Sequence, residues 1–167
     1  FAKKGDKNYF KLPKPIIHKG GCNLSFAGLK TAVLKISKKI KNVEEKYHLA
    51  ASFQKTVEDI LFEKSNFAMN LFNEKHTNRK NVFVIAGGVA SNNKIRKKLV
   101  DLSIRKNFEP IFPPKNLCSD NAAMIAAAGL WAYERQEVAS WDLDANANLL
   151  HGVSCSEETT PFEVFNK

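Results

Sequence analysis

Two adjacent glycines, Gly87 and Gly88, end an apolar stretch of the chain, and Asn92 follows them after three residues. Glycine has no side chain, so a backbone that carries it can lie directly against a ligand. The start of a following helix offers N–H groups to an anion, and the Asn92 amide both donates and accepts hydrogen bonds. The same pattern is typical of a plain strand–turn–helix joint capped by Asn92. Both interpretations stay open on these residues alone, although the pattern matches neither a P-loop nor a G-x-G-x-x-G fingerprint.

Two charged residues lie at the starts of other expected helices. Asp120 follows a loop, and its carboxylate can cap the next helix or face outward as a metal ligand; the cap is the commoner role. Lys30 lies near a helix start, where the helix dipole disfavours a cation. Such a mismatch can mark a functional residue, although a solvated lysine is the commoner explanation.

The elements around these residues predict an α/β domain. The run Val82 to Ala86 is continuously apolar and predicts a strand covered on both faces. A helix is expected from about Asn93 to Arg105, a short strand at Pro110 to Phe112, and a helix from Asp120 or Asn121 to about Arg135. Strand–helix–strand–helix order is typical of a sheet with parallel strands flanked by helices.

Two helices are expected before the first strand. Apolar residues at helical spacing predict a helix from about Ala27 to Lys41, with Ser25 as its cap. A longer apolar stripe predicts a helix from about Tyr47 to Phe72, and its aromatic residues indicate core packing rather than a ligand site. Residues 1–25 are broken by glycine and proline, and residues 136–167 show no clear period.

Composition narrows the class of protein. The chain has 167 residues, a net charge of +9 and three cysteines, Cys22, Cys118 and Cys155. The odd number and wide spacing of the cysteines disfavour a disulfide framework, so a reducing cytoplasm is expected. No apolar run is long enough to cross a bilayer. Basic clusters recur and suit either a phosphate backbone or a lysine-rich surface; they are Lys35, Lys38, Lys39 and Lys41, then Lys94, Arg96, Lys97 and Lys98, then Arg105 and Lys106.

Three segments in this order resemble the tRNA threonylcarbamoyladenosine transferase family, once called O-sialoglycoprotein endopeptidases or glycoproteases. The family carries S-F-S-G-L-K-T, A-G-G-V-x-x-N and [CS]-x-D-N-[AG]-A-M-I-A. The corresponding segments here are Ser25–Thr31, Ala86–Asn92 and Cys118–Ala126. The resemblance covers about residues 1 to 135. One departure is Ala27, where the family usually has serine.

The resemblance implies a fold and a site. Residues 1–135 would form the C-terminal lobe of the two-lobed fold of actin, Hsp70 and sugar kinases, with a mixed sheet flanked by helices, and residues 136–167 a tail. Gly87, Gly88 and Asn92 would bind the adenylate substrate, and Asp120 would be a ligand of one divalent metal ion, iron or zinc. The family's H-x-x-x-H metal motif has no counterpart among His18, His48, His76 and His151. Because the chain opens on Phe1, we expect it to be cut from a longer protein. Because the half of the site that carries the H-x-x-x-H motif is missing, we expect the chain to be inactive alone.

The resemblance also implies an activity and partners. The family transfers threonylcarbamoyl from threonylcarbamoyl-adenylate to the adenosine next to the tRNA anticodon. Its partners would be tRNA, a paralogous protein of the actin-like fold and a small ATPase, without a membrane. Three alternatives remain: a partner-binding paralogue that has lost the site, an ATP-dependent sugar kinase, and a metallopeptidase. The last is disfavoured because no H-E-x-x-H motif is present.

Overall fold

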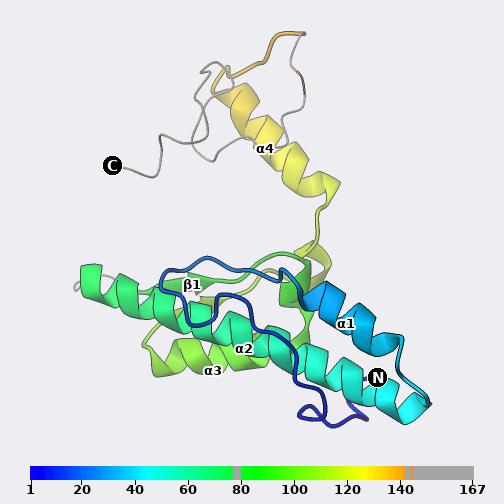
Figure 1. The fold of residues 1–167 in the computed structure, drawn as a ribbon. Coiled ribbons are helices and arrows are strands. Elements are labelled where there is room, and N and C mark those ends of the chain that lie inside the picture. The colour runs from blue at the N-terminus through cyan, green and yellow to red at the C-terminus, as the bar shows by residue number, and fades with distance from the viewer. Residues whose placement is uncertain (77–79, 142–143, 145–167) are drawn as a thin grey trace. The chain divides into compact units, whose positions relative to one another are not determined.

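The computed structural model describes residues 1–76, 80–141 and 144. The chain divides into two compact units, Phe1–Asn121 and Ala122–Lys167 (Figure 1). The first unit contains every candidate site residue. The boundary that the sequence predicts at residue 135 is a different one and stays a prediction, and most of the predicted tail lies outside the described residues.

Within its described residues, the first unit contains three α-helices, two short strands and two 3-10 turns. In chain order these are α1 (Leu29–Ser37), α2 (Val43–Lys75), β1 (Val82–Val84), η1 (Gly88–Ser91), α3 (Asn93–Arg105), β2 (Glu109–Ile111) and η2 (Lys115–Leu117). The second unit begins with α4 (Ala122–Glu134), close to the predicted bounds. Among the described residues of that unit, no side chain of α4 is buried.

The two strands pair in parallel, with Phe83 opposite Pro110, so the α/β class with parallel pairing is confirmed. The first strand ends at Val84 rather than Ala86, although the Ile85 N–H still donates to the Ile111 carbonyl at 3.0 Å. Phe83 packs on the core, so one face of the strand is covered as expected. The Val84 side chain is 61% exposed within the described residues, and cover of the second face stays a prediction.

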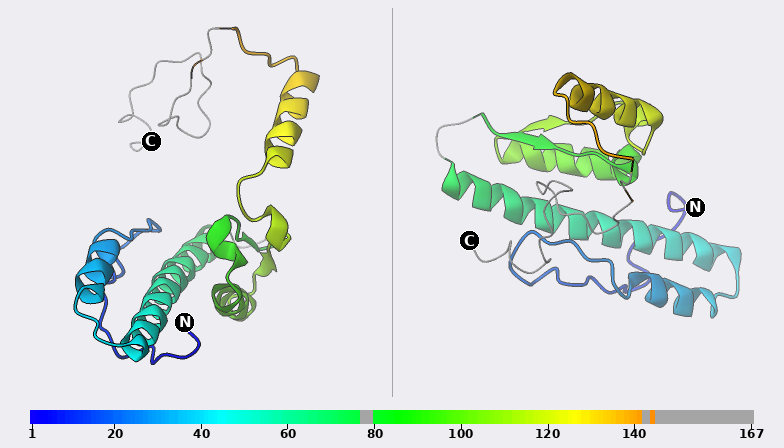
Figure 2. Two further views of the ribbon diagram at one scale, coloured as in Figure 1. Left: turned by 90° about the vertical axis from the view of Figure 1, so that its right-hand side faces the viewer. Right: turned by 90° about the horizontal axis from the view of Figure 1, so that it is seen from above.

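Helix α2 is the element on which the rest of the first unit packs. Helices α1 and α3 lie on opposite sides of it (Figure 2). One core cluster joins it to α3, and its buried members are Met69, Ile95, Leu99, Leu102 and Phe108. The other joins it to α1 and the N-terminal segment, and its buried members are Leu12, Leu29 and Leu49. Val57 packs against both clusters.

The first two helices differ in their bounds from the prediction. Helix α1 begins only at Leu29, after Gly28 in the left-handed conformation (φ 76°). The prediction that Ser25 caps it is wrong: the Ser25 hydroxyl accepts from the Ala27 N–H at 3.2 Å, three residues short of the helix. Helix α2 begins earlier than predicted because Asn42 caps it by accepting from the Glu45 N–H at 2.8 Å.

The N-terminal segment is irregular, as expected, and side chains of α2 hold it in place. The His48 Nδ1 atom accepts from the Asp6 N–H at 2.8 Å, and the Ser52 hydroxyl accepts from the Phe10 N–H at 3.1 Å. Further along, the buried Lys64 ammonium donates to the carbonyls of Lys19 and Gly21 at 2.6 and 3.1 Å. A buried ammonium needs such acceptors, so Lys64 fixes the loop that leads into α1.

Asp59 of α2 joins three segments through one carboxylate. Its Oδ2 atom accepts from Lys14 and Lys55 at 2.7 Å, and its Oδ1 atom accepts from Lys98 of α3 at 2.8 Å. The side chain is only 16% exposed. Burial by itself would raise the pKa of Asp59, but hydrogen bonds from the three ammonium groups outweigh it and hold the pKa well below its ordinary value of 3.8.

Within the described residues, no helix is both long enough and apolar enough to span a bilayer. Helix α2 has the length, with 33 residues, but charged side chains recur along it. It functions as the packing surface of the unit rather than as a continuous apolar rod.

The Asp59 cluster predicts a loss of stability in acid. Because the pKa of Asp59 is lower in the folded than in the unfolded chain, its contribution is complete above about pH 4 and declines as the pH falls further. We expect Asp59→Asn to lower the free energy of unfolding at pH 7 by about 2 kcal/mol. It should also flatten the dependence of that free energy on pH between about pH 4 and pH 2.

Denaturant melts across this pH range measure both effects. Asp101→Asn, which removes an exposed carboxylate of α3, is the matched control and leaves the acid slope in place. An Asp59→Asn variant with an unchanged acid slope contradicts the role of the cluster.

Candidate functional site

A groove of about 860 Å³ lies between α1, α2 and the turn that leads into α3. This volume is in the range of sites that take a nucleotide-sized ligand. The residues that line it come from five segments of the first unit: the loop before α1, α1 itself, α2, the turn η1 with Asn92 at its end, and α3. They are Phe26, Leu29, Lys30, Val33, Ala50, Phe53, Gln54, Val57, Gly88, Val89, Ser91, Asn92 and Ile95.

The structure brings together residues from two of the three motif segments. Lys30 comes from the first, and Gly88 and Asn92 come from the second. These segments are far apart in the sequence, and α2 lies between them in the chain. Their meeting at one groove is the geometric result that the spacing of the motifs alone did not establish.

The glycine turn needs glycine at one position and leaves room at the other. Gly87 has φ 86° and ψ 167°, a region of backbone conformation that is nearly restricted to glycine. Gly88 has no positive φ. A Cβ atom added to either residue meets no atom within 4 Å. Gly87 therefore fixes the direction of the turn, and Gly88 leaves its backbone open to the groove.

Asn92 is the N-cap of α3. Its Oδ1 atom accepts from the N–H groups of Lys94 and Ile95 at 3.0 and 3.3 Å. The interpretation of Asn92 as a cap is therefore confirmed. The predicted anion site at the start of α3 is weakened, since the cap already uses two of the helix's first N–H groups. Ligand binding by Gly87, Gly88 and Asn92 stays a prediction, with the Asn92 Nδ2 atom as the group suited to it.

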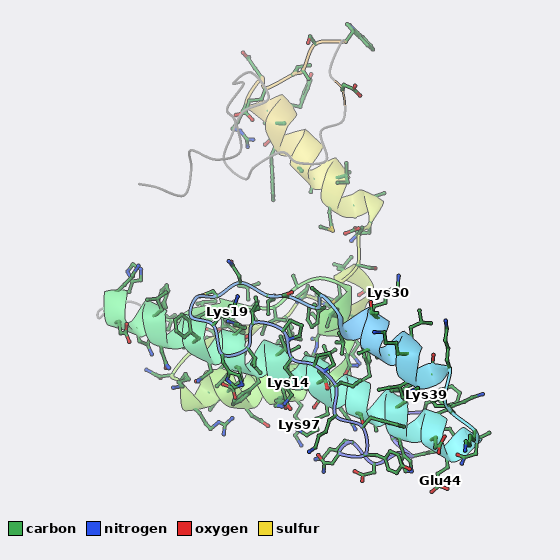
Figure 3. The ribbon with its side chains drawn as sticks, viewed as in Figure 1. Lys14, Lys19, Lys30, Lys39, Glu44 and Lys97 are labelled. Carbon is green, nitrogen blue, oxygen red and sulfur yellow. The ribbon has the colours of Figure 1, made fainter. Side chains whose placement is uncertain are left out.

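Lys30 occupies the second position of α1, at the edge of the groove. Within the described part of the chain, no side chain caps this helix. The Leu29 N–H donates to the Phe26 carbonyl at 3.1 Å, but the positive end of the helix dipole and the Lys30 ammonium are both beside the same groove. Figure 3 labels Lys30 at the start of α1.

The groove walls are mainly apolar, and some of their residues were not predicted from the sequence. Phe53 was assigned to the packed stripe of the second helix, but its side chain is 41% exposed and lines the groove. Gln54 carried no signal at all. A stripe at helical spacing does not separate a residue in the core from one at the core's edge, so the pattern offered no means of finding them.

Arg96 connects the glycine turn to the loop that precedes Asp120. Its Nε atom donates to the Ala90 carbonyl at 3.1 Å, and its Nη2 atom donates to the Pro113 carbonyl at 3.3 Å and contacts the buried Cys118 sulfur at 3.4 Å. The guanidinium also lies over the Phe112 ring at 4.4 Å. Arg96 was predicted within a basic surface cluster, but these contacts make it an internal brace.

Asp120 is exposed and does not line the groove. Helix α4 starts at Ala122, so Asn121 directly precedes it, and capping by Asp120 stays a prediction. No group of three or more histidine, cysteine, aspartate or glutamate side chains that could hold a metal ion occurs among the described residues. Asp120 alone does not meet the three protein ligands that a catalytic transition-metal site usually takes.

Comparison with known proteins identifies relatives. A family model described as TsaD, tRNA N6-adenosine threonylcarbamoyltransferase, matches residues 1–127. A protein of that name from Pelagibacter ubique (strain HTCC1062) is 58% identical over 160 residues, which cover 91% of this chain and 45% of that protein. Its namesake from Orientia tsutsugamushi (strain Ikeda) is 46% identical over 136 residues, 77% of this chain and 40% of the relative.

A third namesake, from Rickettsia rickettsii (strain Sheila Smith), is 44% identical over 139 residues, 81% of this chain and 40% of the relative. The chain thus spans less than half the length of the curated relatives it matches. The matches cover Lys30, Gly88 and Asn92, the motif residues that meet at the groove.

The two glycines predict opposite effects on stability. Gly87→Ala forces a Cβ into a conformation that only glycine adopts easily, so we expect the free energy of unfolding to fall by about 2 kcal/mol. Gly88→Ala places a methyl group in open space and reduces the freedom of the unfolded chain, so stability should stay equal or rise by up to about 1 kcal/mol. Thermal and denaturant melts compare the two variants directly, and equal losses in both would contradict this account of the turn.

Proposed function

The chain belongs to the tRNA N6-adenosine threonylcarbamoyltransferase family, and from this premise we propose that it forms part of an enzyme that modifies tRNA. The full-length protein transfers threonylcarbamoyl from threonylcarbamoyl-adenylate to the adenosine next to the anticodon. The observation that carries the proposal is the groove at which Lys30, Gly88 and Asn92 meet. The proposal places the enzyme in the cytoplasm, with a paralogue of the same fold and a small ATPase as its partners.

The groove suits an adenylate in three respects. Phe53, Val57 and Val89 offer apolar surface to a purine ring. The Asn92 amide offers a polar contact beside it. Gly88 lets the ligand approach the backbone without a side chain between them. These features support the assignment of Gly88 and Asn92 to substrate binding; Gly87 does not line the groove, and its proposed part in binding is to shape the turn.

The charge at the start of α1 suits the leaving group. In the reaction, the adenosine N6 amine attacks the carbamoyl carbon, the bond from that carbon to the phosphate oxygen breaks, the amine loses a proton, and AMP leaves. Negative charge grows on the phosphate oxygen as that bond breaks. The Lys30 ammonium and the first N–H groups of α1 are suited to stabilise it, because fixed positive charge near a developing anion lowers the barrier.

The activity itself provides the test. We expect the full-length protein to incorporate threonylcarbamoyl into tRNA, measured with labelled threonine by mass spectrometry of the nucleosides, and the 167 residues alone not to do so. Lys30→Gln should slow the transfer at least about tenfold. Lys35→Gln, an exposed lysine of the same helix that does not line the groove, should leave the rate unchanged.

The outcomes test the proposed activity and the proposed role of Lys30 separately. A full-length protein that makes no threonylcarbamoyladenosine overturns the proposed function. An active protein whose rate is indifferent to Lys30→Gln keeps the function but places the leaving-group contact elsewhere.

Asp120 is proposed as one ligand of a divalent metal ion whose remaining protein ligands are not among the described residues. Asp120→Asn in the full-length protein should lower the bound metal to less than about half of the unaltered value, since losing one of three or four ligands weakens a site severely. Elemental analysis after dialysis measures this without reference to activity. Glu63→Gln, an exposed carboxylate of α2, is the control. Equal metal content in the Asp120 variant would mean that this residue is not a ligand.

A further inference from the structure

A second hollow, of about 380 Å³, lies between the N-terminal segment, α2 and α3. Its lining is strongly basic, with six lysines against two carboxylates. The lysines are Lys3, Lys7, Lys55, Lys94, Lys97 and Lys98, and the carboxylates are Glu58 and Asp101. Figure 3 labels Lys97, together with Lys14 of the neighbouring Asp59 cluster, where α2 passes α3. The lysines thus come from three separate segments that the fold brings to one concave surface.

The acidic groups near this hollow are partly engaged already. Asp59 accepts from Lys55 and Lys98, as well as Lys14, so one carboxylate serves three ammonium groups. Glu58 accepts from the Gln54 amide at 2.9 Å. The local balance therefore remains positive, and of the lysines that line the hollow the Asp59 cluster holds Lys55 and Lys98 in place.

Four of the lysines are available to an external anion. Lys3, Lys7, Lys94 and Lys97 are exposed, and none has an ion-pair partner in the part of the chain that the structure describes. Lys94 lies in the first turn of α3, where the helix dipole disfavours a cation. A phosphate placed there would interact favourably with the Lys94 ammonium.

The hollow adjoins the groove. Gln54 lines both, and Asn92 of the groove is separated from Lys94 of the hollow by a single residue. A nucleotide in the groove that is part of a longer strand would therefore have neighbouring phosphates within reach of the basic hollow. The apolar groove alone suits a small nucleotide; the pair of surfaces suits a polynucleotide.

We propose that the basic hollow, centred on Lys94 and Lys97, binds the phosphate backbone of the RNA substrate beside the groove. This inference rests on the proposed function, because it takes the polynucleotide to be the RNA that the enzyme modifies. The lysines contact phosphates and not base edges, so the hollow adds affinity and position without reading sequence. Arg96 has no part in the contact, since its guanidinium is used internally.

The test measures the salt dependence of RNA binding by the full-length protein. Each phosphate contact contributes about 0.7 to 0.9 to the slope of log K against log salt concentration. Lys94→Gln with Lys97→Gln should therefore lower the slope by about 1.4 to 1.8. Between 50 and 200 mM salt, the loss of affinity should become about tenfold smaller. Both a tRNA transcript and an unrelated RNA hairpin should show this change.

The matched control removes the same charge elsewhere. Lys38→Gln with Lys39→Gln changes two exposed lysines after the end of α1 that line neither the basic hollow nor the groove. This double variant should leave the salt slope unchanged. An equal change in both pairs would overturn the proposal, because net charge and not the hollow would then govern binding. Circular dichroism melts verify that the variants remain folded. The folded state should survive the substitution of Lys94, because its ammonium interacts unfavourably with the helix dipole.

Other ligands are distinguished in the same assay. If poly-glutamate competes for Lys94 and Lys97 while RNA binding is indifferent to their loss, the hollow binds an acidic protein and the proposal is overturned. If tripolyphosphate binding depends on the two lysines and RNA binding does not, the ligand is a free phosphate, and the proposal is again overturned. A full-length protein that modifies tRNA with an unchanged salt slope in the Lys94 and Lys97 variant overturns this inference alone. A protein that binds RNA through the hollow without modifying it overturns the proposed function instead.

Discussion

The first unit depends on the burial of two separate faces of one helix. Helix α2 has 33 residues, and a helix of this length with apolar residues on two sides is stable only when both sides are covered. The cluster around Leu102 covers one side and the cluster around Leu29 covers the other. Val57 packs against both and also lines the groove. The groove therefore lies beside α2, between α1 on one side and the turn that leads into α3 on the other, and its position follows from the packing of α2.

Internal bonds then fix the segments that border the groove. Arg96 holds the turn after Gly87 to the loop at Pro113, and Lys64 holds the loop before α1 by two carbonyls. Both are cations that serve backbone oxygens rather than solvent. A strained glycine conformation persists only when its surroundings determine it, and the bond from Arg96 to Ala90 supplies such a constraint. The open backbone at Gly88 is thus a fixed feature of the groove and not a consequence of loose packing.

The sequence predicted the order and type of the elements, and it singled out residues that the fold brings together. Glycine pairs, capping residues and apolar period are local signals, so the glycine turn and the helices were accessible. Three outcomes depended on contacts between residues far apart in the sequence, so local signals did not predict them. Ser25 does not cap α1, because the left-handed Gly28 delays the helix. Phe53 lines the groove because residues of α1 and of the turn before α3 form its other walls. Arg96 faces inward because the Pro113 loop lies within its reach.

The distribution of charge follows from the same packing. Three lysines converge on Asp59 because the N-terminal segment, α2 and α3 meet at that point, and without the carboxylate their mutual repulsion would oppose the contact. Once it is present, further lysines of α3 can occupy the adjacent surface without an internal partner, since the repulsion that remains is screened by water and salt. The core thus determines where the three segments meet, and the Asp59 carboxylate offsets the repulsion among the lysines that these segments bring together. Gln54 lines both the basic hollow and the apolar groove, so the two surfaces adjoin each other. In the proposed complex, an adenosine that enters as part of a strand would meet apolar walls at its base and positive charge at its phosphates.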